Sequence, residues 1–184
     1  MATEIEPAFR GVNANTLDVR TIIGAILPRG HVIHGYSSGN STRMLMILAS
    51  RKYSDKAPLL GFGADGFAEG ALARALLTYA LREQRGLDFI TEQQLPESTR
   101  GALPPGCNNS RFDNIVWGGD FKLYQEGDVV VAWSQYGSVN GLMPTEVTAP
   151  DALRAIELLT DTYMFMNPNV RNLPAISLDY VPNS

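Results

Sequence analysis

The stretch Phe121-Lys-Leu-Tyr-Gln-Glu-Gly-Asp-Val-Val-Val-Ala-Trp-Ser134 decides the fold class of this 184-residue chain. Apolar and polar residues alternate over Phe121–Gln125, and a mostly apolar run covers Val129–Ser134, which are the patterns of a half-exposed strand and of a covered strand. Between them, Glu126-Gly127 is the short, glycine-bearing connection that tight hairpins favour. The two segments are therefore predicted to pair as an antiparallel hairpin.

A further strand is expected just before this hairpin, at Asn114–Trp117. The residues are apolar enough for a strand, and Gly118-Gly119 separates them from Phe121 by another short glycine-bearing connection. The three segments together are predicted to form an antiparallel meander.

A second block of strands is expected earlier in the chain. His31–Tyr36 alternates weakly, and Pro58–Phe62 is expected to add a third strand if Met44–Ala49 is itself a strand. Met44–Ala49 is continuously apolar, and periodicity alone does not distinguish a strand from a helix there. As a strand it would leave residues 38–41 as a hairpin loop, whereas as a helix it would begin on a glycine-bearing loop of the kind that binds phosphates.

Three amphipathic helices are predicted from apolar side chains that recur with the helical period. The first is capped by Asn15 and ends at Pro28, and the second covers Phe67–Arg82, with Asp65 as its start and Gly86 as its stop. The third begins at the capping-box pattern Thr148-Ala-Pro-Asp151 and ends at Asn167-Pro168. The inward-facing stripes are Val19, Ile22, Ile23 and Ile26; Ala68, Leu72, Leu76 and Ala80; and Leu153, Ile156, Leu159 and Tyr163.

Helices grouped with hairpins, rather than a strict alternation of strand and helix, favour the α+β class. We expect a single domain over residues 1–184, with at least three helices packed on one side of an antiparallel sheet made from the two strand blocks. Residues 1–14 and 168–184 are expected to be extended surface segments. A doubly wound α/β arrangement remains open only if Met44–Ala49 is helical.

The composition narrows the function classes. The chain has 19 acidic and 15 basic side chains and a formal net charge of −4, so it lacks the positive charge that nucleic-acid binding selects for. No segment is apolar enough for a signal peptide or a membrane span, so we expect a soluble, cytoplasmic protein without a membrane partner. The single cysteine, Cys107, excludes an internal disulfide and a thiolate metal cluster.

The densest group of polar side chains lies between His34 and Arg43. Its glycines and hydroxyls allow main-chain N–H groups to converge on an anion, Arg43 adds a charge-assisted contact, and His34 is expected to titrate near neutral pH. The sequence therefore predicts a loop that binds a small phosphate- or carboxylate-bearing molecule, although a plain hairpin turn is the alternative. The proposed contact residues are Gly35, Ser37, Ser38, Gly39, Asn40, Ser41, Thr42 and Arg43.

The segment Gly35-Tyr-Ser-Ser-Gly39 also matches the nucleophile elbow of the α/β-hydrolases, with Ser37 as the attacking hydroxyl. That mechanism needs a histidine base, and no histidine follows Ser37 in the chain. His34 lies on or near the same strand, where its ring would have difficulty reaching Ser37 Oγ. The match therefore does not supply a complete triad.

Three further features resemble ADP-ribosyltransferases of the diphtheria-toxin and poly-ADP-ribose-polymerase type. They are His34-Gly35 on a strand, Gly61-Phe-Gly63 with Phe67 before a helix, and Glu126 just before the run Asp128–Val131. The resemblance implies that His34-Gly35 holds the ribose and carboxamide of NAD. It also implies that Glu126 stabilises the cationic ribose as the glycosidic bond breaks. Tyr36 departs from that family, which usually has a small hydroxyl residue at this position.

Other combinations of residues are less specific. The spacing of His31 and His34 sends them to opposite faces of a strand, which does not indicate a metal site. Asp113 and Asp120 flank the expected strand Asn114–Trp117 and are a candidate acid–base pair, although aspartates at strand ends also cap turns. The aromatic residues of the meander are expected either to fill the core or to form a stacking or partner surface. They are Trp117, Tyr124, Trp133 and Tyr136.

The leading expectation for function is therefore the binding of a small anionic molecule at the loop from His34 to Arg43. Whether the protein is an enzyme stays open, and the sequence specifies no cofactor. The alternative is a non-catalytic interaction or assembly subunit that uses a strand edge or the aromatic meander face to pair with a protein partner or with itself as a homo-oligomer. A second alternative is an ADP-ribosyltransferase-like, NAD-dependent enzyme with His34 and Glu126 as its catalytic residues.

Overall fold

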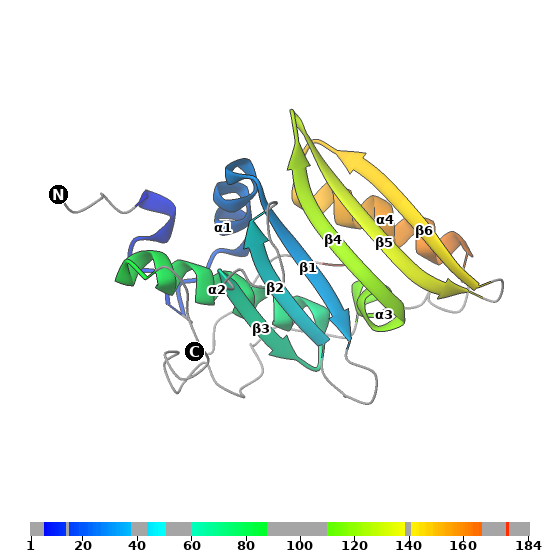
Figure 1. Cartoon of the computed structure of the whole chain (residues 1–184), viewed down its shortest axis with the longest axis horizontal. Coiled ribbons are helices and arrows are strands. Elements are labelled where there is room, and N and C mark those ends of the chain that lie inside the picture. Colours follow the sequence, from blue (N-terminus) through cyan, green and yellow to red (C-terminus); the bar gives the residue numbers. More distant parts are fainter. Residues whose placement is uncertain are drawn as a thin grey trace.

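A computed structural model describes residues 6–13, 15–37, 44–50, 60–87, 110–138, 141–166 and 176. Six strands from these residues form one antiparallel sheet in the order β3-β2-β1-β4-β5-β6. The first three strands make one meander and the last three make another, and the pairing of β1 with β4 joins the two blocks in the centre of the sheet (Figure 1). The strands are β1 (His31–Ser37), β2 (Met44–Ser50), β3 (Gly61–Asp65), β4 (Gly119–Glu126), β5 (Val129–Ser138) and β6 (Gly141–Ala149).

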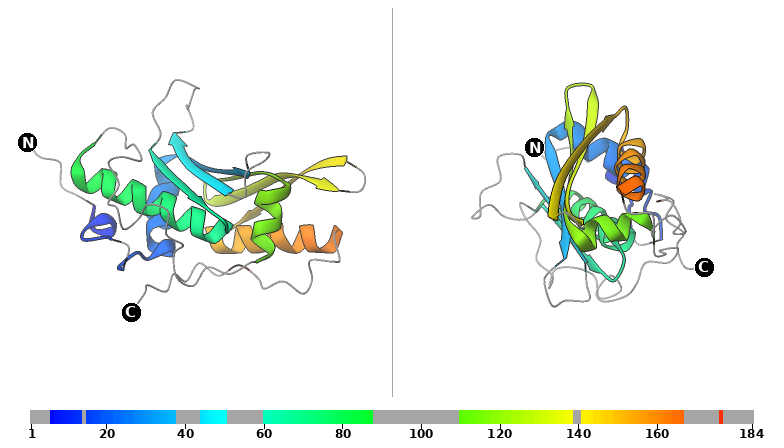
Figure 2. Two further views of the ribbon diagram at one scale, coloured as in Figure 1. Left: turned by 90° about the horizontal axis from the view of Figure 1, so that it is seen from below. Right: turned by 90° about the vertical axis from the view of Figure 1, so that its right-hand side faces the viewer.

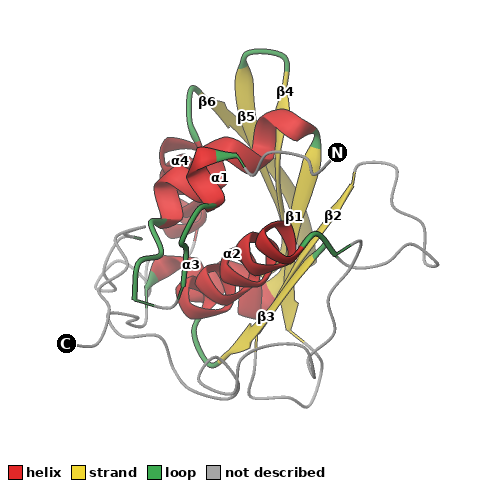
Figure 3. Cartoon of the chain, turned by 90° about the vertical axis from the view of Figure 1, so that its left-hand side faces the viewer, coloured by secondary structure: helices red, strands yellow, loops and turns green. Residues whose placement is uncertain are grey.

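Within the described residues, four α-helices pack on this sheet, which confirms the α+β class. Figure 2 shows all four on the same side of the sheet, and Figure 3 shows α1 beside α4 while α2 runs along the half of the sheet formed by β1–β3. The helices are α1 (Val19–Ile26), α2 (Ala68–Arg85), α3 (Arg111–Gly118) and α4 (Ala152–Met166). Two short 3₁₀ helices, η1 (Pro7–Phe9) and η2 (Leu27–Arg29), precede β1.

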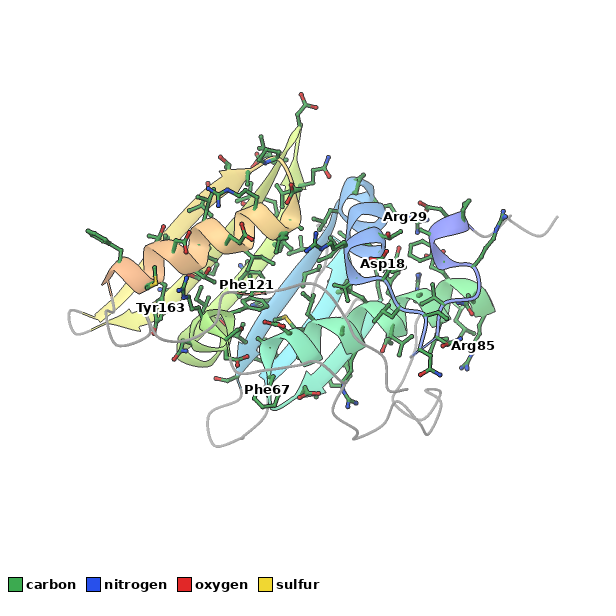
Figure 4. All side chains as sticks on the ribbon, turned by 180° about the vertical axis from the view of Figure 1, so that it is seen from behind. Asp18, Arg29, Phe67, Arg85, Phe121 and Tyr163 are labelled. Atoms are coloured by element: carbon green, nitrogen blue, oxygen red, sulfur yellow. The ribbon has the colours of Figure 1, made fainter. Side chains whose placement is uncertain are left out.

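The strand register separates the side chains of the sheet into a covered face, on which the helices pack, and a second face that no helix of the described residues covers and that is called the uncovered face below. Ile33 pairs with Leu123 and Gly35 pairs with Phe121, and all four residues are buried on the helix-covered side. Phe121 points from β4 toward α3, where its ring meets the edge of Phe112 with centroids 4.9 Å apart (Figure 4). Because side chains alternate along a strand, the positions between these residues face the opposite side.

The β1–β2 pairing settles the open question about Met44–Ala49. This segment is strand β2, paired with β1 in a register that sets Ser37 opposite Met44. The doubly wound α/β alternative is therefore excluded, and so is a strand-loop-helix phosphate site at residues 38–43. The third strand of this block covers Gly61–Asp65, somewhat later than the predicted Pro58–Phe62.

The predicted helices are confirmed, with shifted starts. Asp18, rather than Asn15, caps α1, because its carboxylate accepts hydrogen bonds from Thr21 N at 3.2 Å and Thr21 Oγ1 at 2.8 Å. Gly86 ends α2 in the left-handed conformation (φ 63°), where glycine avoids steric strain. Asp151 caps α4 and accepts a hydrogen bond from Arg154 N at 2.9 Å.

Two predictions about the later block need correction. Asn114–Trp117 is not a strand but lies inside helix α3, whose residues Phe112, Ile115 and Val116 are fully buried. Strand β6, which the sequence reading did not anticipate, completes the second meander. It lies at the edge of the sheet, where Pro144 is tolerated because only one side of the strand is paired.

The chain ends are described only in part. Phe9 is fully buried against Tyr79, with ring centroids 5.5 Å apart, and residues 1–5 and 14 lie outside the described residues. Of the segment 168–184, only Ile176 is described, and its side chain is buried. None of the helices described here combines the length and the apolar character that crossing a membrane requires.

Candidate functional site

The loop predicted to bind an anion lies mostly outside the described residues. Ser38, Gly39, Asn40, Ser41, Thr42 and Arg43 all fall there. Gly35 is described and has a packing role, because a Cβ atom at this position would lie 2.7 Å from Met46 Sδ and 3.4 Å from Phe121. The described residues of this loop therefore belong to the end of strand β1, where it pairs with β2. The binding of an anion by the loop stays a prediction.

His34 projects from the uncovered face of β1. Its Nε2 lies 4.0 Å from Asp120 Oδ1, its ring is 5.4 Å from that of Tyr36, and Lys122 is its cross-strand partner. Partial burial is the main reason that the pKa of His34 lies below its usual value; Lys122 adds to this shift and Asp120 opposes it. Partial burial thus favours the neutral form of His34, which lies beside Tyr36, Asp120 and Lys122.

The structure does not bring His34 and Glu126 together. Lys122 is the residue opposite His34, and Glu126 lies four positions farther along β4, about 13 Å away along the strand. Glu126 is exposed and is the last residue of β4, since the turn itself consists of Gly127 and Asp128. The glycines of Gly61-Phe-Gly63 lie on β3, where they allow close contact with the backbone of α2.

The two aspartates considered as an acid–base pair have separate roles. Asp113 is buried in the first turn of α3, where its carboxylate accepts hydrogen bonds from Ala68 N at 2.6 Å and Ser110 N at 2.9 Å. Burial raises the pKa of Asp113, and the nearby Asp65 carboxylate raises it further. Asp120 is exposed on β4 beside His34. Asp113 therefore links the start of α2 to the start of α3 by hydrogen bonds and does not face Asp120.

His31 belongs to a network that anchors the N-terminal segment. Its Nε2 lies 3.0 Å from Tyr79 Oη, and that hydroxyl accepts a hydrogen bond from Arg29 at 2.8 Å. Arg29 also pairs with Glu6 and with Glu83, and its guanidinium lies 5.0 Å from the centre of the Phe9 ring. Among the described residues, no three His, Cys, Asp or Glu side chains are placed to hold a metal ion.

A pocket of about 410 Å³ lies between α1 and the start of α4, over the end of the β4–β5 hairpin. This volume is within the range of sites for small organic molecules. The pocket lies near the start of β1, because Leu27 lines it and η2 leads directly into that strand. The predicted anion-binding loop follows the other end of β1, and the two ends of this strand are about 20 Å apart. Its apolar lining residues are Ile23, Leu27, Val130, Pro150, Ala152 and Leu153.

The polar groups of the pocket come from three elements. Arg20 of α1, Gln125 of β4 and Asp151 at the start of α4 line it. In the first turn of α4, Arg154 N is bonded to the Asp151 side chain and Ala155 N to the Asp151 carbonyl. Ala152 and Leu153 also line the pocket, and they precede the first of these bonded amides in the chain.

Gly24 forms part of the pocket wall at an unusual position for a glycine. It lies inside α1, where alanine would favour the helix by about 0.5–1 kcal/mol. A Cβ atom at this position would have no heavy atom within 4 Å, so packing does not require the glycine. Gly24 is therefore a pocket-lining residue with open space around it.

Sequence reasoning missed this pocket, although it identified the helices and the hairpin that form it. The lining residues come from positions 20–27, 125–130 and 150–153, and no single segment has a binding motif. The one local signal is the helical glycine Gly24.

Comparisons of the chain with protein-family models, with curated proteins and with solved structures found no match.

Proposed function

We propose that this protein binds a small molecule with an anionic group, and that the pocket between α1 and α4 holds it. The observation that carries this proposal is that Arg20 and the first residues of α4 line one mainly apolar pocket of about 410 Å³. Binding sites for small molecules commonly combine apolar walls with a few such polar groups. The open space around Gly24, which lines the pocket, is a second supporting observation.

Thermal unfolding with a panel of alkyl carboxylates and alkyl phosphates tests the proposal. A ligand present at 100 times its Kd stabilises the folded state by about 2.7 kcal/mol. For a chain of this length, that corresponds to a rise in Tm of roughly 5–10 °C. At least one member of the panel is expected to produce such a rise in the unaltered protein.

Two glycine variants assign the binding to this pocket. Gly24→Leu places a side chain at the pocket wall and is expected to remove the ligand-induced rise in Tm. Gly66→Leu adds the same side chain at another exposed glycine that has open space around it and is expected to keep the rise. An equal rise in the Gly24→Leu protein, or loss of the rise on Arg43→Gln alone, would place the ligand elsewhere.

A second candidate function is self-association through the uncovered face of the sheet. All four described α-helices cover the other face (Figure 2), and one row of outward residues crosses the central strands. In this row His34 is opposite Lys122, and Lys122 is opposite Trp133, with Lys122 Nζ 4.9 Å from the centre of the indole ring. A partly exposed tryptophan in a sheet face is a feature that protein interfaces favour.

Sedimentation equilibrium over a range of protein concentrations tests this second candidate. If the sheet face pairs two copies, Trp133→Glu is expected to weaken self-association by at least about tenfold, because a buried interfacial tryptophan typically contributes 2 kcal/mol or more. Phe165→Glu is the matched control, since Phe165 is 80% exposed near the end of α4. A protein that is monomeric at every concentration would contradict self-association.

A further inference from the structure

We propose that a proton on His31 opens the contact between the N-terminal residues 6–10 and helix α2, so that this part of the chain responds to pH. The proposal concerns a conformational change and does not depend on ligand binding in the pocket between α1 and α4. It rests on a group of residues around the Tyr79 hydroxyl, called the Tyr79 cluster below. The members of the cluster are Glu6, Phe9, Arg29, His31, Tyr79 and Glu83.

Arg29 and Tyr79 hold the N-terminal residues on α2. The Arg29 guanidinium, at the end of η2, pairs with Glu6 of the N-terminal segment and with Glu83 of α2. The Phe9 ring is fully buried and lies against Tyr79 of α2, with ring centroids 5.5 Å apart. A change that displaces Arg29 and Tyr79 therefore acts on both contacts.

The hydroxyl group of Tyr79 couples Arg29 to His31. Burial raises the pKa of Tyr79, so the hydroxyl keeps its proton. Its oxygen accepts a hydrogen bond from Arg29 Nη1 at 2.8 Å, and its proton is left for His31 Nε2, which lies 3.0 Å away. We assign to neutral His31 the tautomer with its proton on Nδ1, because only an unprotonated Nε2 accepts this bond.

A proton on His31 Nε2 reverses this bond. The ring nitrogen then donates to the Tyr79 oxygen, which already accepts from Arg29, and the Tyr79 proton loses its acceptor. His31 Nδ1 is buried without a hydrogen-bond partner among the described residues, so no acceptor offsets the added charge there. Arg29 and His31 then compete for one oxygen, which weakens the arrangement that holds the N-terminal residues on α2.

The charged groups around His31 also act on this proton. Among the described residues they are Arg29 of η2 and Arg82 and Glu83 of α2, and Glu6 reaches the cluster through Arg29. The pKa of His31 lies below its usual value, mainly because of partial burial; the two arginines lower it further and Glu83 opposes the shift. His31 therefore binds a proton more weakly in the closed arrangement than in an open one, where water surrounds the ring. As the pH falls through the interval between these two pKa values, the closed arrangement is destabilised relative to the open one.

The bonds from Gln84 limit the extent of this opening. Its side-chain amide donates to the carbonyl oxygens of Phe9 at 2.6 Å and Val12 at 2.9 Å. These bonds contain no titratable group, so they favour the closed arrangement equally at every pH. The proton on His31 therefore shifts a local equilibrium between closed and open forms, and the shift is reversible.

Hydrogen exchange of the Phe9 amide at pH 5 and pH 7.5, expressed as protection relative to an unstructured peptide, tests the proposal. This amide donates to the Glu6 carbonyl at 2.9 Å, so its protection reports whether the N-terminal segment is closed. One histidine with an ordinary pKa of about 6.5 in the open form can shift the equilibrium by at most about thirtyfold at pH 5. The protection of Phe9 is expected to be at least fivefold lower at pH 5 than at pH 7.5.

Two histidine variants assign the response to the Tyr79 cluster. His31→Gln keeps a side-chain oxygen that can accept the Tyr79 proton and cannot become charged, so the difference in Phe9 protection is expected to fall to twofold or less. His34→Gln is the matched control, because it removes the other histidine of the chain, and it is expected to keep the full difference. A difference that persists in the His31→Gln protein would overturn the proposal.

NMR titration of the unaltered protein is a second measurement that requires no variant to fold. The midpoint of the His31 ring titration is expected to coincide with that of the fall in Phe9 protection. Above this midpoint, the nitrogen signals of the ring are expected to show a proton on Nδ1 and none on Nε2. Equal protection of Phe9 at pH 5 and pH 7.5, or two separate midpoints, would overturn the proposal and leave the proposed function standing.

Discussion

Gly63→Ala is expected to lower the free energy of unfolding by about 3 kcal/mol or more, which is a large part of the 5–15 kcal/mol that a typical domain has. A Cβ atom on Gly63 would lie 2.1 Å from the carbonyl oxygen of Ala71 and 2.6 Å from the amide nitrogen of Ala75. Both are backbone atoms of α2, so no side chain can rotate away to make room. The whole helix must move away from β3, and the contacts between the two are lost.

Gly66→Ala is the matched control for this variant. Gly66 lies three positions later, at the turn into α2, and a Cβ atom there would have no heavy atom within 4 Å. It is expected to change the free energy of unfolding by no more than about 0.5 kcal/mol. Urea denaturation followed by circular dichroism measures both variants. A Gly63→Ala protein within 1 kcal/mol of the unaltered one, with an unchanged m-value, would show that α2 does not need this close contact.

The elements that the sequence predicted well are those whose signals are local. Small and apolar residues recur every four positions from Ala68 to Ala80 in α2, an 18-residue helix that ends at Gly86 in the left-handed conformation. Likewise, the β4–β5 turn contains Gly127 with φ 60°, and strand alternation flanks it on both sides. In each case, the residues that specify the element lie within it, so a single window of sequence contains the information.

Helix α3 was mistaken for a strand because its stability comes from distant residues. Its residues Asn114-Ile-Val-Trp117 are β-branched, aromatic or amide-bearing, and such short runs fit a strand equally well. What keeps them helical is tertiary: Asp113 bonds to Ala68 N, 45 positions away, and Phe112 packs on Phe121. Strand β6 was missed because Pro144 argues against a strand, except at an edge, and edge position is a property of the whole sheet.

The candidate pocket was beyond sequence reasoning for a similar reason. Arg20 is separated from Gln125 and Asp151 by more than a hundred positions in the chain, and the three residues meet only because α1 and α4 pack side by side. The polar loop from His34 to Arg43 attracted attention because its donors are contiguous. Contiguous donors also suit a β-hairpin, and the β1–β2 pairing shows that the segment joins two paired strands.

Asp65 and Arg74 form the most deeply buried ion pair among those described. Arg74 Nε lies 3.0 Å from Asp65 Oδ2, and the two side chains are only 12% and 1% exposed. Asp65 also accepts a hydrogen bond from Phe67 N at 3.1 Å, which ties the end of β3 to the start of α2. Burial raises the pKa of Asp65, although Arg74 and the Phe67 amide oppose this shift.

Arg74→Met is expected to lower the free energy of unfolding by about 3–5 kcal/mol at pH 7.5, because it leaves the Asp65 carboxylate buried without its cation. The loss is expected to be smaller at pH 4.5. A carboxyl group whose pKa is higher in the folded state than in the unfolded state binds more protons when folded. It therefore lowers the free energy of unfolding as the pH rises through the interval between these two pKa values. Removing Arg74 raises the folded-state pKa of Asp65 further and widens the interval.

The control for this prediction is Arg154→Met. Arg154 pairs with Glu157 at 3.4 Å, but the two side chains are 52% and 34% exposed, so the loss is expected to be below about 0.5 kcal/mol at both pH values. Adding Asp65→Asn to the Arg74→Met protein removes the buried charge and is expected to restore part of the free energy of unfolding. The remaining loss, relative to the unaltered protein, is expected to be the same at pH 4.5 and pH 7.5. If the double variant keeps that pH dependence, another group causes it, and Arg74 does not act by neutralising Asp65.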